Sequence, residues 1–209
     1  TATDFEANPN RRYSASADDR MEWNRQGITL GWRLLAGEDW DLRTTVYHHR
    51  LDRTWFKVNG FSDGTSMHDL LYTEPTAGQG AAYLEVLRGT ADSNGVGDRI
   101  LKGANDRQFQ NTGVTSIGHW RTAFGKAQNE LEVGVRWHKD DVRRHHTQRP
   151  FNMVDGALQQ AEAERETTLD SHNDATALAV HIHDDFRLGK LTVLPGVRHE
   201  RITTQTGTP

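Results

Sequence analysis

Apolar and polar residues alternate along two neighbouring stretches in the first quarter of the chain. The first stretch has an apolar residue at every second position, Ile28, Leu30, Trp32 and Leu34. After a break at 36–39, the second stretch repeats the pattern with Trp40, Leu42, Thr44 and Val46. Successive side chains of a β-strand point to opposite faces, so each stretch has one apolar and one polar face. The pattern predicts a hairpin over about 22–51.

Two further hairpins are predicted by the same alternation. The second spans about 109–144, turns at 124–128, and has the return-strand residues Leu131, Val133, Val135 and Trp137. The third pairs 178–182 with 191–197 across a turn at 188–190. Pro195 cannot donate a hydrogen bond to a strand ladder. Because the alternation continues on both sides of this proline, we still predict a strand there.

The segments between these hairpins are long and polar. We expect an extended loop over residues 1–21 and a glycine-rich segment over 52–108 that holds a short helix at 81–87, ended by Gly89. Residues 145–173 are expected to hold one or two helical turns. Short turns that alternate with long connections are typical of outer-membrane barrels, with tight periplasmic turns and long extracellular loops. A soluble sandwich has short connections throughout.

The fold predicted is therefore all-β, a segment of an antiparallel up-and-down transmembrane β-barrel. Tryptophan positions agree with it, because Trp40 directly follows a turn and Trp137 lies roughly 30 Å of strand beyond its own turn at about 3.3 Å per residue. That separation is near the height of an apolar band bounded by two aromatic girdles. A soluble β-rich binding or adhesive module is the alternative.

Composition narrows the class of protein further. Of the 209 residues 34% are hydrophobic and none is cysteine, and the mean hydropathy is -0.79. These values suit strands with one apolar face and long loops, and the sequence has no apolar run of about 18 residues. The net charge of -4 is dispersed, which gives no nucleic-acid footprint. Hydrolase, P-loop and zinc-protease motifs are missing, so we do not expect an enzyme.

Short motifs over nearly the whole chain resemble TonB-dependent outer-membrane receptors of the ferric dicitrate type. The motifs are Asp4-Phe5, Asn8-Pro9, Arg11-Arg12-Tyr13, Asp19-Arg20-Met21, Trp23, Arg53-Thr54-Trp55, Asn59-Gly60-Phe61, His119-Trp120-Arg121, Phe151, Met153-Val154 and Pro195-Gly196-Val197-Arg198. The resemblance implies a 22-stranded barrel in a bacterial outer membrane, with a plug domain inside it. It also implies uptake of a ferric siderophore or ferric citrate, energised by TonB with ExbB and ExbD.

The chain has no recognisable TonB box or plug. We therefore interpret residues 1–209 as an excerpt, part of the barrel domain of a longer receptor that lies in outer-membrane lipid. A passive porin-like channel is a further alternative, which a plug and a TonB box would exclude.

An anionic ferric chelate would be bound by cations, because guanidinium groups make bidentate contacts with carboxylates. The candidates near the loop bases are Arg11, Arg12, Arg53, Lys57, Arg143, Arg144 and Arg149. Four arginines on the polar strand faces are instead expected to pair with Asp41, Glu132 or the plug; these are Arg33, Arg43, Arg121 and Arg136.

Histidines offer a weaker candidate for a metal site. His181 and His183 share one strand face at i, i+2 spacing, which can bring two imidazoles to one metal ion. No further ligand at diagnostic spacing supports such a site. We therefore expect no resident metal or covalently bound cofactor, since the iron would arrive already chelated.

Overall fold

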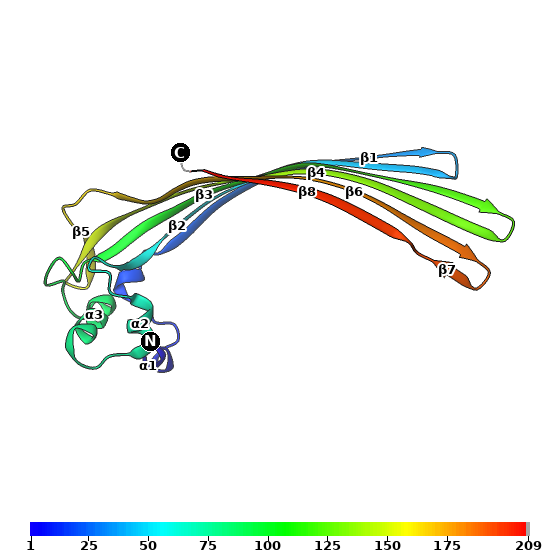
Figure 1. The fold of residues 1–209 in the computed structure, drawn as a ribbon. Helices are drawn as coiled ribbons and strands as arrows, with labels where there is room; N and C mark the ends of the chain where they lie inside the picture. The colour runs from blue at the N-terminus through cyan, green and yellow to red at the C-terminus, as the bar shows by residue number, and fades with distance from the viewer. Residues whose placement is uncertain (208–209) are drawn as a thin grey trace. The chain divides into compact units, whose positions relative to one another are not determined.

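The computed structural model describes residues 1–207, whose elements are labelled in Figure 1. The helices are α1 (Ala2–Ala7), the 3-10 helix η1 (Ser14–Ser16), α2 (Met67–Thr73) and α3 (Gly78–Arg88). The strands are β1 (Arg20–Ala36), β2 (Trp40–Phe61), β3 (Ile100–Phe124), β4 (Ala127–Val154), β5 (Ala157–Gln160), β6 (Glu166–Leu188), β7 (Leu191–Val193) and β8 (Gly196–Gly207).

All eight strands form one sheet in the order β1-β2-β3-β4-β6-β7, with β5 paired to β4 and β8 paired to β6. The long strands β1, β2, β3, β4 and β6 thus lie side by side in chain order, which is the up-and-down topology predicted. The three predicted hairpins are confirmed. Their turns each contain a glycine with positive φ, namely Gly37 (68°), Gly125 (62°) and Gly189 (61°).

The main strands are much longer than the alternation indicated. The prediction ended the first hairpin near residue 51 and began the second near 109, but β2 continues to Phe61 and β3 begins at Ile100. The added parts mix polar and apolar residues on both faces, so the apolar alternation that marks a strand is missing from them. Strand pairing continues there without an apolar face.

A second difference lies in residues 145–173, where we expected one or two helical turns. Within this range the structure shows β4, β5 and β6 but no helix. Asp155 and Gly156 both adopt positive φ, 51° and 74°, and they join β4 to β5 in a fourth hairpin, with Val154 opposite Ala157. Asp-Gly is a favoured pair for two-residue hairpin turns. The segment therefore forms paired strands on both sides of this turn, although it is polar.

The chain divides into two compact units, of which the second comprises Asn24–Asp52, Gln108–Arg143 and the part that begins at Ser171. This unit holds the alternating stretches, and the apolar side chains of one strand face are exposed. They are Ile28, Leu30, Trp32, Leu34, Trp40, Val46, Trp120, Val133, Val135, Trp137, Leu178, Val180, Ile182, Val193 and Val197. An exposed apolar face of this size is unlike the surface of a soluble monomer.

Contacts between strands confirm the separation of the two faces in this unit. On the apolar face, Thr44 Oγ1 lies 2.6 Å from Ser116 Oγ, and the rings of Trp40 and Trp120 stack with centroids 5.5 Å apart. On the opposite face, Tyr47 Oη lies 2.6 Å from His138 Nδ1. Trp40 lies directly after the β1–β2 turn, as predicted, and Trp120 stacks on it there.

Pro195 interrupts the last predicted strand without ending the pairing. Leu194 and Pro195 separate β7 from β8, because proline has no N–H for the ladder. Its carbonyl still accepts a hydrogen bond from Asp184 N at 2.9 Å. From Gly196 onward β8 pairs with β6 in regular antiparallel register, Gly196 opposite His183 and Ile202 opposite Ala177.

The first unit comprises Thr1–Trp23, Arg53–Arg107 and Arg144–Asp170 and contains the buried core. Side chains from the strand ends and from α2 and α3 pack together, with η1 at one side; they are Ala15, Val58, Phe61, Leu70, Tyr83, Leu84, Val86, Leu87, Ile100 and Met153. The long β2–β3 connection is therefore a packed element rather than an open loop.

Helices in this unit match the prediction in part. The helix predicted at 81–87 is α3, which ends as expected at Gly89 with φ 80°. Helix α2 was not predicted, although Ser66 caps it by accepting a hydrogen bond from Asp69 N at 3.2 Å. Residues 1–21 form α1 and η1 instead of an extended loop. No helix of residues 1–207 has the length and apolar character needed to cross a membrane.

We predict that Leu84→Ala loosens the packed β2–β3 connection. Leu84 is only 2% exposed, and a leucine deleted from a core costs about 2–5 kcal/mol of stability. Hydrogen exchange of the α3 amides in the full protein should accelerate accordingly. Val96→Ala is the matched control, because Val96 is 67% exposed and its truncation should change stability by about 0.5 kcal/mol or less. Equal protection in both variants would contradict the assigned core.

Candidate ligand-binding site

Three arginines from neighbouring strands gather in the first unit. Arg53 lies on β2, Arg107 on β3 and Arg144 on β4, and these strands are adjacent in the sheet. All three side chains are half-buried. Burial, together with the charges of Arg53 and Arg144, lowers the pKa of Arg107. The guanidinium groups of Arg53 and Arg144 are thus close enough to act on that of Arg107, and we call the three residues the arginine cluster.

His146 completes the arginine cluster as a neutral partner. Arg107 Nε donates a hydrogen bond to His146 Nε2 at 3.2 Å. Burial and the charges of Arg107 and Arg144 lower the pKa of His146. The imidazole therefore stays uncharged at neutral pH and accepts the arginine N–H. It fixes the orientation of Arg107 without neutralising it.

Two members of the arginine cluster, Arg107 and Arg144, have little compensation for their positive charge. Within residues 1–207, neither Arg107 nor Arg144 forms an ion pair with a carboxylate, and Arg144 Nε is buried with no hydrogen-bond partner. Like charges in a partly buried setting are costly unless an opposite charge joins them. An anion with several oxygen atoms would satisfy both the charge and the vacant donor.

The predicted cations divide between this cluster and other positions. Arg53 and Arg144 are brought together, and Lys57 lies on β2 with its Nζ 5.3 Å from the Trp55 ring centroid. Arg143 and Arg149 have the opposite parity to Arg144 along β4 and so lie on its other face.

Arg11 and Arg12 lie in the segment between α1 and η1, and both are exposed.

Arg107 was missed by the sequence analysis because it lay in a segment interpreted as a loop. The signal was present in the alternation of the second hairpin. Counting back in twos from His119 through Gly113 places Arg107 on the polar face of the same strand. Around Arg107 the other face of this strand has no apolar alternation, and the strand was therefore not predicted there.

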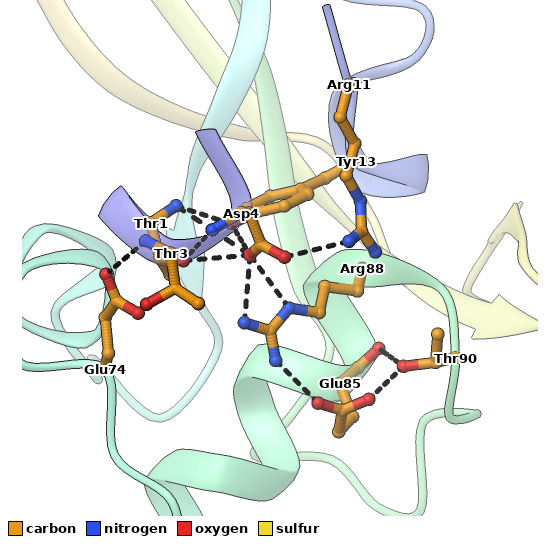
Figure 2. A network of polar contacts seen from close by, with 9 residues as sticks. All are labelled: Thr1, Thr3, Asp4, Arg11, Tyr13, Glu74, Glu85, Arg88 and Thr90. Carbon is orange, nitrogen blue, oxygen red and sulfur yellow. Dashed lines mark hydrogen bonds and ion pairs between the residues drawn. The ribbon is translucent and has the colours of Figure 1, made fainter. Parts of the chain in front are cut away.

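Arg11 belongs to a separate polar network around Asp4 (Figure 2). Asp4 Oδ1 accepts a hydrogen bond from Arg11 Nη1 at 2.8 Å, and Asp4 Oδ2 accepts bonds from Tyr13 Oη at 2.5 Å and from Arg88 Nε at 3.0 Å. Arg88 also pairs with Glu85 at 2.7 Å. The network joins α1 to α3, so Arg11 already has a carboxylate partner.

Burial opposes the ionisation of Asp4, but hydrogen bonds from Tyr13 and Arg88 outweigh it. They hold the pKa of this carboxyl well below its ordinary range. The Asp4 side chain is 13% exposed. Its charge therefore contributes to the docking of α1 on α3.

On the polar face of the second unit, three of the four arginines expected to pair have partners. Arg33 Nε donates to Asp41 Oδ2 at 2.8 Å, as predicted. Arg121 pairs with Glu130 at 3.2 Å rather than with Asp41 or Glu132. Arg136 Nη2 donates to Tyr47 Oη at 3.3 Å. Arg43, the fourth, is exposed.

The two histidines considered for a metal do not act together. His181 Nε2 lies 2.8 Å from Glu132 Oε1, and His119 Nε2 lies 2.9 Å from Glu132 Oε2. The carboxylate thus bridges two imidazoles from β3 and β6, and His183 is not part of this group. Among residues 1–207 there is no group of three or more His, Cys, Asp or Glu side chains suited to hold a metal ion.

Comparison with known proteins shows the family to which the chain belongs. The family model described as TonB dependent receptor-like, beta-barrel matches residues 1–209. The ferric citrate transporter FecA in its unliganded form matches with a TM-score of 0.64 and 16% identity, over 99% of this chain and 24% of that chain. No curated protein matches the chain.

Two further solved structures share the fold. BauA, the ferric preacinetobactin receptor from Acinetobacter baumannii, has a TM-score of 0.57 and 7% identity over 93% of this chain and 27% of that one. The ferric-catecholate import receptor Fiu from E. coli K12, closed form, has a TM-score of 0.56 and 10% identity, over 95% and 26%. The chain therefore spans about a quarter of the length of these structures.

We predict that Asp4→Asn destabilises the first unit by about 1–3 kcal/mol at neutral pH, the usual range for hydrogen bonds to a charged group. A carboxyl with a lowered folded pKa adds stability above its unfolded pKa of about 3.9 and loses it as the pH falls toward the folded value. The difference in stability between the wild type and Asp4→Asn should therefore shrink below about pH 4. Glu6→Gln, on the exposed side of α1, is the control. A pH-independent difference would show that the charge of Asp4 is not responsible.

Proposed function

The chain belongs to the TonB-dependent receptor β-barrel family, and from this premise we propose that it forms part of the wall of an outer-membrane receptor that takes up a ferric chelate. The exposed apolar face of the second unit supports contact with lipid. The opposite face, with Arg33, Asp41 and Tyr47, supports a water-filled or plug-filled interior.

The arginine cluster is the observation that carries the proposed ligand class. Arg53, Arg107 and Arg144 offer fork-shaped donors, and a neutral His146 leaves the charge of Arg107 in place. Carboxylates are the natural partners of such forks. A ferric complex of a carboxylate-bearing chelator such as citrate therefore fits this site better than an uncharged one. Lys57 and the exposed Arg12 extend the proposed ligand surface.

The remaining partners follow from the family. We propose that transport is driven by TonB with ExbB and ExbD, acting on a plug domain encoded outside residues 1–209. The ferric chelate is cargo and not a resident cofactor. Citrate and siderophore complexes are alternatives within this one class of ligand.

The proposal predicts that Arg53→Gln and Arg144→Gln each weaken capture of ferric citrate by the full receptor. Loss of a charge-assisted contact worth about 1.5–3 kcal/mol corresponds to a roughly 10–100-fold rise in Kd. Binding to the purified receptor and uptake of radiolabelled iron by cells measure the two steps separately. Lys126→Gln, in the exposed β3–β4 turn, removes one positive charge far along the strand and should leave both values unchanged.

A second ligand sharpens this test. A ferric chelate without free carboxylates should depend less on Arg53 and Arg144. If ferric citrate and every other ferric chelate tested bind the variants and the wild type equally well, the arginine cluster is not the capture site. The family membership would stand in that case.

A further inference from the structure

His146 gives the arginine cluster a group that can take up a proton. Arg107 Nε donates a hydrogen bond to His146 Nε2 at 3.2 Å, so Nε2 offers its lone pair and the neutral ring carries its proton on Nδ1. A proton on Nε2 would set two donors against each other, because the arginine N–H cannot act as an acceptor. His146 therefore has a neutral state that accepts from Arg107 and a charged state in which this hydrogen bond is broken.

The cations around His146 favour its neutral state. Arg144 lies two residues before His146 on β4 and therefore on the same face of that strand. Burial and the positive charges of Arg107 and Arg144 lower the pKa of His146. From β2, Arg53 adds a positive charge that acts on Arg107. As long as no anion is bound, one more positive charge at this place is unfavourable.

The carboxylates near His146 are turned away from it or bound to another side chain. The charge of Asp106 on β3 acts to raise the pKa of His146, but Asp106 directly precedes Arg107 and so lies on the other face of the strand. Glu166, the first residue of β6, accepts a hydrogen bond from Gln148 Nε2 at 3.1 Å. Within residues 1–207 neither of them forms an ion pair with His146. A ligand can therefore supply the negative charge that holds this imidazole protonated.

A bound anion reverses this balance. The carboxylate groups of a chelate would bring negative charge to Arg107 and Arg144. An opposite charge within about 4–6 Å favours the charged form of a titratable group by about 1–3 pKa units. Once Nε2 of His146 is protonated, the Nε–H of Arg107 turns to the ligand, and the imidazolium N–H becomes a second charge-assisted donor. The proton thus releases one donor for the ligand and creates another.

We propose that capture of a carboxylate-bearing ferric chelate at the arginine cluster is coupled to the uptake of one proton by His146. The proton comes from solvent and joins Nε2, and no other covalent bond forms or breaks. The inference rests on the proposed function of the arginine cluster and adds the regulation of that site by pH. His146 orients Arg107 in the free receptor and binds the ligand directly in the complex.

The direction of the pH dependence follows from the two states of His146. In the free receptor its pKa lies below the ordinary value of about 6.5, and the bound anion raises it. Between these two pKa values the complex therefore holds more protons than the free receptor. Affinity for the chelate is highest below the lower pKa, falls as the pH rises through the window, and is constant above the higher one. Each unit of difference between the two pKa values corresponds to an about 10-fold change in Kd.

The test measures binding of ferric citrate to the full receptor, purified in detergent, at about pH 5.5 and about pH 7.5, on the two sides of the ordinary histidine pKa. In His146→Gln the side-chain oxygen still accepts from Arg107 but cannot take up a proton. The ratio of Kd at the higher pH to Kd at the lower pH should be about 10-fold larger in the wild type than in this variant. Effects of pH on the chelate itself cancel in the comparison. His145→Gln should keep the wild-type ratio, because the exposed His145 faces the other side of β4 and lies 3.3 Å from Asp170.

Calorimetry in two buffers of different ionisation enthalpy counts the protons directly, and inside the pH window the wild type should take up about half a proton or more per chelate in excess of His146→Gln. Heat-modifiable migration in gels checks that each variant is folded, and His146→Asn replaces a variant that fails this check. No excess proton uptake, or an equal Kd ratio in the wild type and a folded variant, overturns the coupling and leaves the capture site in place. If the wild type binds no ferric citrate at either pH, the proposed ligand is wrong and the coupling is overturned with it.

Discussion

Backbone pairing is the constraint on which the rest of this structure depends. In hydrocarbon every N–H and C=O must find a partner within the protein, so a membrane wall made of strands needs an unbroken ladder. The order of neighbours from β1 to β8 provides that ladder across the apolar face. Even Pro195, which cannot donate, accepts a bond from Asp184. The two edge strands, β1 and β8, leave one side to be paired by other strands of a barrel.

The first unit is stabilised by a buried core. Strands β2, β3 and β4 continue into this unit, where their apolar side chains pack within the protein. Phe61, Leu84, Ile100 and Met153 belong to that core, and the fully buried Lys102 joins the segment after η1 to β3 through Asp18 and Asp19. Removing one partner of a buried ion pair destabilises a protein strongly, because the other charge is then buried without compensation. This arrangement therefore holds the strand ends, and with them Arg53 and Arg107, in a fixed register.

Sequence reasoning succeeded where one side of a strand is apolar. The three hairpins, their glycine turns and the end of α3 at Gly89 all carry local signals, and the structure confirms them. It failed where both faces of a strand mix polar and apolar residues, as in 52–61 and 100–108, because the two faces then show no contrast that periodicity could detect. The β4–β5 hairpin was overlooked although Asp155-Gly156 is itself a turn signal, since a run of glutamates nearby favoured helix.

The candidate cations also show which features could be predicted from the sequence and which could not. Residue type and position near the expected loop bases selected seven cations as candidates, but a strand assigns each cation to a face by its parity. Arg144 and Arg149 are five positions apart on β4, so they face opposite sides of the sheet. Correct strand bounds would have separated them and added Arg107 on β3. Which three arginines converge, however, depends on the register between β2, β3 and β4, and that register is a property of pairing between strands rather than of any single one. Arg144 and Arg149 therefore share a strand and a residue type, and the backbone turns their side chains to opposite faces of the sheet.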